Sequence, residues 1–354
     1  MNIVGANLLR TISPAPRDVW LEVLESDPTA FVYQTPAGLD AICAQRNCED
    51  ASRLYEFADG RRLVLPLFRR KGLPSWLAME RSPLVGSLVA PGPLRAEELT
   101  AIFSDLASRP VLSTTIRPTA LSSDVWASAE LPGAVSQRRV IHILDLQGGF
   151  DAVWENRFHG QARRAIRKAI KAKVEVECDR GGRLVPVFYD LLKKSIDRWA
   201  AQRHEPLYLA RWRARQRDPM RGLQAIADTL GDACRIWVAR VAGQPAAAIM
   251  VLQGANAHYT RGAMDKDLAG PARASFLLQK LAIEEACNAG CRYYNMGETG
   301  PSEGLARFKS HFGAKAYAFS EYRLERLPIS AIESRLRSLA KKIMAFRSGA
   351  GRSS

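Results

Sequence analysis

The sequence predicts an α/β protein of two units, and three observations support this prediction. The chain has 354 residues, whereas one globular domain usually spans roughly 100–200 residues. The charge is unevenly divided, because residues 1–150 carry 15 basic and 16 acidic side chains while residues 151–354 carry 36 and 20. In the second half, three successive strands precede a helix, a strand, a second helix and a last strand. We therefore expect two units with different roles.

The overall composition excludes several classes of protein. With 47% hydrophobic and 25% charged residues, the chain is unlike disordered, collagen-like or coiled-coil sequences. No apolar run reaches the roughly 18–20 residues that cross a bilayer, and the first ten residues lack the pattern of a secretory signal. The net charge of +15 favours an anionic partner, with an arginine-rich background composition as the alternative explanation.

The cysteines and histidines predict no metal site. The six cysteines contain no Cys-x-x-Cys pair, and no set of cysteines and histidines has zinc-finger spacing. Scattered cysteines in a chain of this length are typical of buried thiols in a reducing compartment. We therefore expect a cytoplasmic protein without a bound metal.

The first half opens with a helix and a hairpin. Val19, Trp20 and Val23 recur at helical spacing. Asp59-Gly60 is a strong two-residue turn signal, because both central positions of such a turn favour positive φ. Residues 71–94 are rich in Gly and Pro and predict irregular structure. In chain order we expect helices at 17–26, 39–46 and 96–107, and strands at 53–58, 61–68, 111–116 and 137–146.

The second half opens with the most distinctive segment, residues 157–173, which has seven basic side chains and no acidic one. Ala162, Ile166, Ala169 and Ile170 recur at helical spacing, so one stripe of this helix can pack against a core. The basic side chains then crowd the opposite surface, where like charges at i,i+4 cost a few tenths of a kcal/mol each. Binding of an anionic partner would turn this repulsion into a net attraction. The alternative is a solvated helix face without a partner, for which the small cost is tolerable.

The rest of the second half alternates strands and helices. A polar insertion at 204–220 is rich in arginine and aromatic residues, and a loop at 264–273 precedes the helix that Gly290 ends. We expect strands at 173–178, 234–241, 246–252, 257–263, 292–296 and 315–324, and helices at 185–202, 223–230, 274–289, 302–312 and 330–346.

Residues 237–325 resemble the FemAB-like branch of the GNAT acyltransferase superfamily, including its BioF2-like and CelD-like acetyltransferase relatives. The matching segments are GQPAAAIMVL, HYTRGAMDKDLAGPARASFLLQKLAIEEACNAGCRYYNMGETG and GLARFKSHFGAKA. Upstream, RRAIRKAIKAKVEVE is similar to a family stretch of the type R-x-x-I-R-K-A-x-K that precedes a strand. Over residues 1–150 the resemblance consists mainly of the hairpin around Asp59-Gly60 and an LPLF strand.

The resemblance implies an α/β (α+β) fold of two tandem GNAT-like lobes, each a mixed, mostly antiparallel sheet flanked by helices. We expect a degenerate lobe in residues 1–150, the acyltransferase lobe in residues 151–327, and a basic helix with a flexible tail in residues 328–354. The implied activity is transfer of an acyl or aminoacyl group to an amine. The implied donor is acyl-CoA, such as acetyl-CoA, or the aminoacyl-tRNA of the peptidoglycan-bridge enzymes. Both donors are polyanions, which suits the basic half.

The donor loop departs from the pattern of ordinary GNAT enzymes, which hold the CoA pyrophosphate on a glycine-rich turn at a helix N-terminus. Here the loop from Leu268 to Ser275 has one glycine, and Pro271 removes a backbone N–H donor. Arg273 and Ser275 remain as side chains that can meet a phosphate. We add Arg261 to the predicted donor site, because a charged residue in a central strand usually has a partner.

Three residues are candidates for the chemistry. Lys309 lies at the position of the family's Phe-Lys motif, and the resemblance implies that it stabilises the oxyanion formed at the acyl carbon. Glu298 follows a strand between two glycines and can take a proton from an attacking ammonium, or it can brace the next helix. Tyr259 can line the acyl site or donate a proton, and spacing predicts that it shares a strand face with Arg261.

The basic helix is the second candidate binding surface. We expect Arg163, Arg164, Arg167 and Lys168 to bind phosphates of an acceptor or of tRNA, and the C-terminal helix either packs on the core or contacts an anionic membrane at its inner face. The acceptor stays open among a peptidoglycan precursor, a polysaccharide amino sugar and a small amine. The competing interpretation is a non-catalytic nucleic-acid-binding or envelope-binding protein on a degenerate GNAT scaffold.

Overall fold

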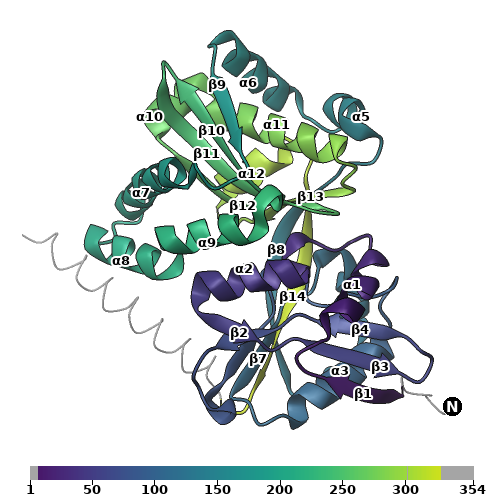
Figure 1. The fold of residues 1–354 in the computed structure, drawn as a ribbon. Helices are drawn as coiled ribbons and strands as arrows, with labels where there is room; N and C mark the ends of the chain where they lie inside the picture. The colour runs from purple at the N-terminus through teal and green to yellow at the C-terminus, as the bar shows by residue number, and fades with distance from the viewer. Residues whose placement is uncertain (1–6, 301, 328–354) are drawn as a thin grey trace, which may run out of the picture.

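The computed structural model describes residues 7–300 and 302–327, which fold into two lobes joined by a shared sheet (Figure 1). The strands of the first half are β1 (Leu8–Ile12), β2 (Cys48–Asp50), β3 (Arg53–Phe57), β4 (Arg62–Leu65), β5 (Phe68–Arg70), β6 (Met79–Arg81), β7 (Ser113–Ile116) and β8 (Ala134–Asp145). Those of the second half are β9 (Glu175–Asp179), β10 (Cys234–Val241), β11 (Gln244–Gln253), β12 (Ala257–Met264), β13 (Tyr293–Glu298) and β14 (Lys315–Glu325).

Eleven of these strands form one sheet in the order β2-β5-β6-β7-β14-β8-β13-β12-β11-β10-β9, and β1, β3 and β4 form a separate three-stranded sheet. The position of β14 joins the lobes. It pairs antiparallel with β8 from Lys315↔Ile143 to Leu324↔Ala134, and its other edge pairs with β7. The last strand of the described chain therefore lies between two strands of the first half, as Figure 1 shows.

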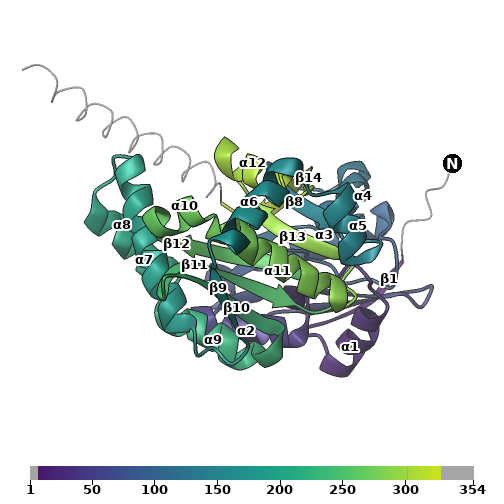
Figure 2. The same ribbon diagram turned by 90° about the horizontal axis from the view of Figure 1, so that it is seen from above.

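The helices cover the sheet on both faces (Figure 2). They are α1 (Arg17–Glu25), α2 (Pro36–Arg46), α3 (Ala96–Ser108), α4 (Ser123–Ser128), α5 (Gly149–Asn156), α6 (Gly160–Lys171), α7 (Val185–Gln202), α8 (Leu207–Arg217), α9 (Met220–Leu230), α10 (Lys266–Ala272), α11 (Ala274–Asn288) and α12 (Glu303–Ser310). Short 3-10 turns lie at Val32–Gln34, Ser75–Leu77, Ala120–Ser122 and Gly231–Ala233.

The two faces of strands β10–β12 have different cores. On one face, α7 and α9 pack with α2 of the first lobe, so that buried residues such as Leu39, Leu223 and Met250 form one core across both lobes. On the other face, α11 packs on β10 and β11 with α5 and α6 beside it, around Leu278 and Ile166. The site described below lies within the shared sheet, at the neighbouring strands β12 and β13.

The structure confirms the predicted α/β fold class with a mixed, mostly antiparallel sheet flanked by helices, and the three-strand meander is present as β10, β11 and β12. One local prediction was wrong. The expected loop at 264–273 contains the helix α10, with Pro271 inside it. Asp265 starts this helix by accepting a hydrogen bond from the backbone N–H of Asp267 at 3.1 Å, which the sequence pattern around Gly270-Pro271 did not reveal.

The predicted C-terminal helix at 330–346 lies outside the described residues. Within the ranges that the structure describes, no helix has both the length and the apolar character that crossing a membrane requires.

Candidate active site

The candidate site lies where strands β12 and β13 separate. The two strands pair in parallel at Ala257↔Tyr294 and His258↔Asn295, and their ladder ends there. Just beyond, Gly297 has a φ of +77°, and a Cβ at this position would lie 3.5 Å from the carbonyl oxygen of Tyr259. Glycine is the residue that adopts this conformation most readily.

Lys309 reaches this point from helix α12. Ser302 begins that helix by accepting a hydrogen bond from the backbone N–H of Leu305. The ammonium Nζ of Lys309 donates hydrogen bonds to the carbonyl oxygens of Gly297, at 2.6 Å, and Glu298, at 2.9 Å. Only 1% of the residue is exposed. A lysine ammonium has three N–H donors, so one is left for a ligand.

Burial changes the acidity of this lysine. Desolvation lowers the pKa of Lys309 to about 8, although the negative charge of Glu298 opposes the shift. At neutral pH the side chain is therefore mostly protonated, and it loses its charge when the pH rises above about 8. Stabilisation of an oxyanion requires the positive charge of this protonated form.

The shifted pKa predicts a pH-dependent stability. Because the folded protein holds this proton less tightly than the unfolded chain, the free energy of unfolding rises with pH between about 8 and the ordinary value of 10.5. We expect wild type to gain about 2 kcal/mol relative to Lys309→Met between pH 7.5 and pH 10. Urea unfolding of both proteins measures this difference, and a difference that does not change with pH would contradict the buried charge.

Glu298 is held by arginines of the first half. One carboxylate oxygen lies 3.3 Å from Nη1 of Arg117, and the other lies 3.7 Å from Nη1 of Arg139. Both arginines also bind the buried carboxylate of Glu321, which is 3% exposed. Burial would raise the pKa of Glu321, but the charges and hydrogen bonds of Arg117 and Arg139 outweigh it and lower the value. Glu298 thus links the lysine to an arginine cluster between the lobes.

Two buried histidines that no sequence motif indicated lie near the lysine. His142 lies on β8 and His258 on β12, and the Nδ1 atom of each is buried without a hydrogen-bond partner in the described structure. Burial, with a smaller contribution from the charge of Lys309, lowers the pKa of His142. Burial, with the charges of Arg261 and Lys309, lowers that of His258 to about 3. Both rings are therefore neutral at physiological pH. In the sequence, only their position inside apolar strands indicates that these histidines are buried.

The prediction that Tyr259 and Arg261 share a strand face was wrong. Met250 of β11 pairs with Arg261 and the next residue, Val251, pairs with Tyr259, so Thr260 forms a β-bulge. A bulge adds one residue and shifts the alternation of side chains. Tyr259 accordingly packs on the α11 side of the sheet, where burial raises its pKa to about 12.

Arg261 faces the opposite side of the sheet. Its Nη2 atom lies 2.6 Å from a carboxylate oxygen of Asp218, which is 2% exposed and precedes α9. Burial would raise the pKa of Asp218, but the charges and hydrogen bonds of Arg261 and Arg217 lower it. The structure therefore does not bring Arg261 together with the other two predicted donor residues.

Arg273 and Ser275 lie at the junction of α10 and α11. Arg273 has a φ of +57°, which ends α10 and turns the chain into the first turn of α11. Next to Ser275, the ring of Phe276 packs against Phe308 and Phe312, at centroid distances of 5.0 and 5.6 Å. These contacts place the N-terminus of α11 beside the helix that carries Lys309.

The predicted basic residues line the outer side of α6. Ala162, Ile166 and Ala169 are buried as predicted, whereas Ile170 is exposed. Arg163 donates a hydrogen bond to the carbonyl oxygen of Glu155 at 3.2 Å. The other three members, Arg164, Arg167 and Lys168, are exposed, and they form no ion pair with the described residues.

Metal ligands are not grouped in the described part of the chain: residues 7–300 and 302–327 contain no set of three or more His, Cys, Asp or Glu side chains placed to hold an ion.

Comparison with known proteins relates the second lobe to one family. Residues 156–310 match the family described as acetyltransferase (GNAT) domain. The chain is similar in fold to the crystal structure of FemX, with a TM-score of 0.66 and 13% identity, over 90% of this chain and 97% of that one. A conserved protein of unknown function from Bacteroides thetaiotaomicron VPI-5482 gives a TM-score of 0.54 and 12% identity, over 90% and 98%. A comparison with curated protein sequences found no match.

Proposed function

We propose that the chain is an N-acyltransferase of the FemAB-like branch, because residues 156–310 match the family described as acetyltransferase (GNAT) domain. It transfers an acyl or aminoacyl group from acyl-CoA or aminoacyl-tRNA to an amine, such as that of a cell-envelope or polysaccharide precursor. The observation that carries this proposal is the buried ammonium of Lys309, bound to the carbonyl oxygens of Gly297 and Glu298 where β12 and β13 separate.

In the proposed reaction, the amine nitrogen attacks the acyl carbonyl carbon, and a C–N bond forms as the C–S or C–O bond to the donor breaks. The third N–H of Lys309 stabilises the oxyanion of the tetrahedral intermediate. Glu298, held by Arg117 and Arg139, takes the proton of the attacking ammonium directly or through water. Tyr259 keeps its phenolic proton, because burial raises its pKa to about 12, and this proton can pass to the leaving thiolate or alkoxide.

The donor site of this proposal is the junction of α10 and α11. A helix N-terminus favours phosphate through its free N–H groups and its dipole, and Arg273 and Ser275 add side-chain donors there. Phe276 and Phe308 connect this junction to the lysine through packed rings. Arg261, which is bound to Asp218 on the other face, has no part in this arrangement.

The exposed basic face of α6 distinguishes the two donors. Each phosphate contact contributes roughly 0.7–0.9 to the slope of log affinity against log salt. If tRNA is the donor, we expect the triple variant Arg164→Gln/Arg167→Gln/Lys168→Gln to lower that slope by about 2 while acetyl-CoA binding stays the same. The variant Arg10→Gln/Arg138→Gln/Arg221→Gln removes the same charge from exposed positions elsewhere and serves as the control. Equal slopes in both variants would exclude α6 from tRNA binding.

A thermal-shift screen with acetyl-CoA, longer acyl-CoAs and bulk aminoacyl-tRNA tests the proposed function, because a ligand of the folded state raises its stability by mass action. Transfer of labelled acyl group to a panel of amines then tests the chemistry. Salt-sensitive RNA binding without any transfer would instead favour a non-catalytic binding protein. We further propose that the protein acts in the cytoplasm and contacts the anionic inner face of the membrane peripherally.

A further inference from the structure

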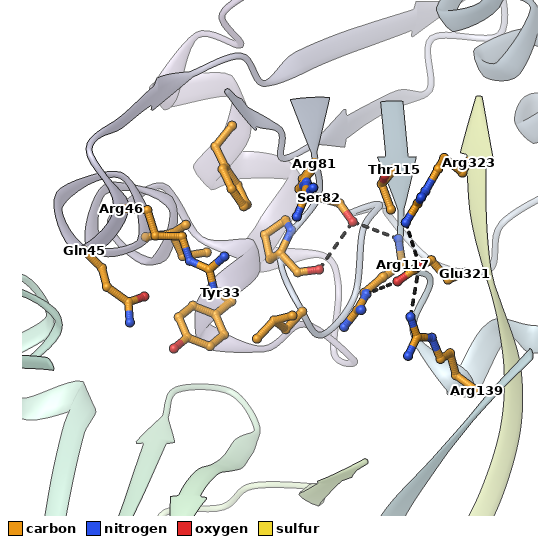
Figure 3. Close-up of a pocket in the computed structure, with 14 residues that line it drawn as sticks. Tyr33, Gln45, Arg46, Arg81, Ser82, Thr115, Arg117, Arg139, Glu321 and Arg323 are labelled. Atoms are coloured by element: carbon orange, nitrogen blue, oxygen red, sulfur yellow. Dashed lines mark hydrogen bonds and ion pairs between the residues drawn. The ribbon is translucent and has the colours of Figure 1, made fainter. Parts of the chain in front are cut away.

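A cavity of about 120 Å³ lies among elements of the first half and β14, and two of its arginines bind Glu298 (Figure 3). One wall is formed by the end of α2 and by Tyr33, and the opposite wall by β7, β8 and β14. The polar and charged residues that line it are Tyr33, Gln45, Arg46, Arg81, Ser82, Thr115, Arg117, Arg139, Glu321 and Arg323.

The charges around this cavity are unequal. Five arginines line it, against the single carboxylate of Glu321. Two further carboxylates contact these arginines from outside: Glu298 binds Arg117 and Arg139, and Glu325 lies 3.4 Å from Nη1 of Arg323. Arginine side chains therefore outnumber carboxylates in the lining of the cavity. A concave site with such an excess attracts an anion.

Two details show that donors in the cluster are available to a ligand. The Nε atom of Arg139 is buried and has no hydrogen-bond partner among the described residues. A buried donor of this kind costs roughly 1–3 kcal/mol unless a ligand or water binds it. Across the cavity, Arg46 forms no ion pair with the described residues, and Figure 3 shows its guanidinium beside Tyr33 on the cavity side of α2.

The cavity is next to the proposed reaction site. Arg117 and Arg139 line the cavity and contact the Glu298 carboxylate, while the backbone carbonyl of the same residue accepts a hydrogen bond from Lys309. The α10–α11 junction lies on the other face of the sheet, where both helices pack against β10 and β11. A donor on that side and an acceptor on the arginine side would therefore meet at Glu298 and Lys309.

We propose that this arginine cavity binds an anionic group, a carboxylate or a phosphate, of the acyl acceptor and so directs its amine to Glu298. Guanidinium groups bind both anions bidentately. The inference rests on the proposed function, because it assigns a substrate class to the same site: an amine that carries an acidic group a short distance from its nitrogen.

Arg46 offers the cleanest test, because replacing it leaves no buried carboxylate of the described structure without a partner. The probes are inorganic phosphate and glycine for binding, measured by calorimetry at constant ionic strength, and three amines for transfer: glycine, O-phosphoethanolamine and the neutral glycinamide. In Arg46→Gln, we expect binding of both anions to weaken at least tenfold and KM for the anionic amines to rise by a similar factor, with kcat and donor binding little changed. The matched control is Arg10→Gln, an exposed arginine of β1 outside the cavity.

The outcomes separate the cavity from the proposed function. Preference for glycine identifies a carboxylate subsite and preference for O-phosphoethanolamine a phosphate subsite, and either preference must diminish in Arg46→Gln. Equal transfer to glycinamide, unchanged by Arg46→Gln, would overturn the inference and leave the acyltransferase proposal intact. Anion binding that depends on Arg46 without transfer to any amine, while a donor shifts the melting temperature, would overturn the acceptor role of the cavity. Absence of anion binding by wild type would overturn the anion site itself.

Discussion

Lys309→Met is expected to lower kcat for acyl transfer by about 10²- to 10³-fold, which is the typical cost of removing one group that stabilises an oxyanion. The side chain is buried, its ammonium is fixed by two carbonyl oxygens, and burial holds its pKa at about 8. Methionine keeps most of the volume and removes the charge, so the fold should persist. Steady-state kinetics with the best donor and amine pair give kcat, and circular dichroism at the same pH verifies the fold.

The control for this variant is Lys71→Met, which removes an exposed lysine of the first half and should leave kcat unchanged. The pH profile adds a second, independent test. If the protonated lysine is the active form, the rate in wild type falls as pH rises through about 8, and this decline is absent from the residual rate of Lys309→Met. An unchanged kcat in a folded Lys309→Met protein would remove the lysine from the mechanism.

Gly313→Ala is expected to lower the free energy of unfolding by about 3 kcal/mol, because two costs combine. Gly313 has a φ of +80°, in which an alanine is strained, and a Cβ there would lie 2.4 Å from the carbonyl oxygen of Arg157. This glycine follows α12 and fixes its end against the start of α6, where the backbone N–H of His159 donates to the carbonyl oxygen of His311 at 2.9 Å. Urea unfolding measures the loss.

Gly290→Ala separates the two costs. Gly290 has a similar φ of +76°, but a Cβ there would meet nothing within 4 Å. This variant should lose only about 1 kcal/mol, the cost of the backbone conformation. Equal losses in the two variants would show that contact with Arg157 contributes nothing, and that α12 is not held at this point.

Local patterns in the sequence predicted the helices and strands of the second half well. The apolar stripe of α6 through Ala162, Ile166 and Ala169 is buried against the core, because a 3.6-residue period is a property of the segment itself. The meander was predicted for the same reason, since alternation and turn residues are local signals. Lys309 was selected through a motif, and its burial agrees with the role proposed for it.

Features that depend on distant contacts were not predictable. Glu298 forms an ion pair with Arg117, which lies 181 positions earlier in the chain. No spacing rule connects such distant positions. The bulge at Thr260 depends on how β11 and β12 pair, and threonine is common in regular strands. The arginine cavity was missed for the same reason: its lining comes from α2, β7, β8 and β14, and only the shared sheet brings them together.

The place of β14 also constrains how the chain can be made and divided. A ribosome releases residues 315–325 long after β7 and β8, yet this strand is the hydrogen-bonded partner of both. During synthesis β8 therefore lacks both of its neighbours in the sheet, β14 and β13, and β7 lacks one, until the second half has emerged. Such unpaired edges invite aggregation. Fragments cut between the lobes should each be insoluble alone, whereas mixing them, or supplying residues 315–325 with the first fragment, should restore a paired sheet.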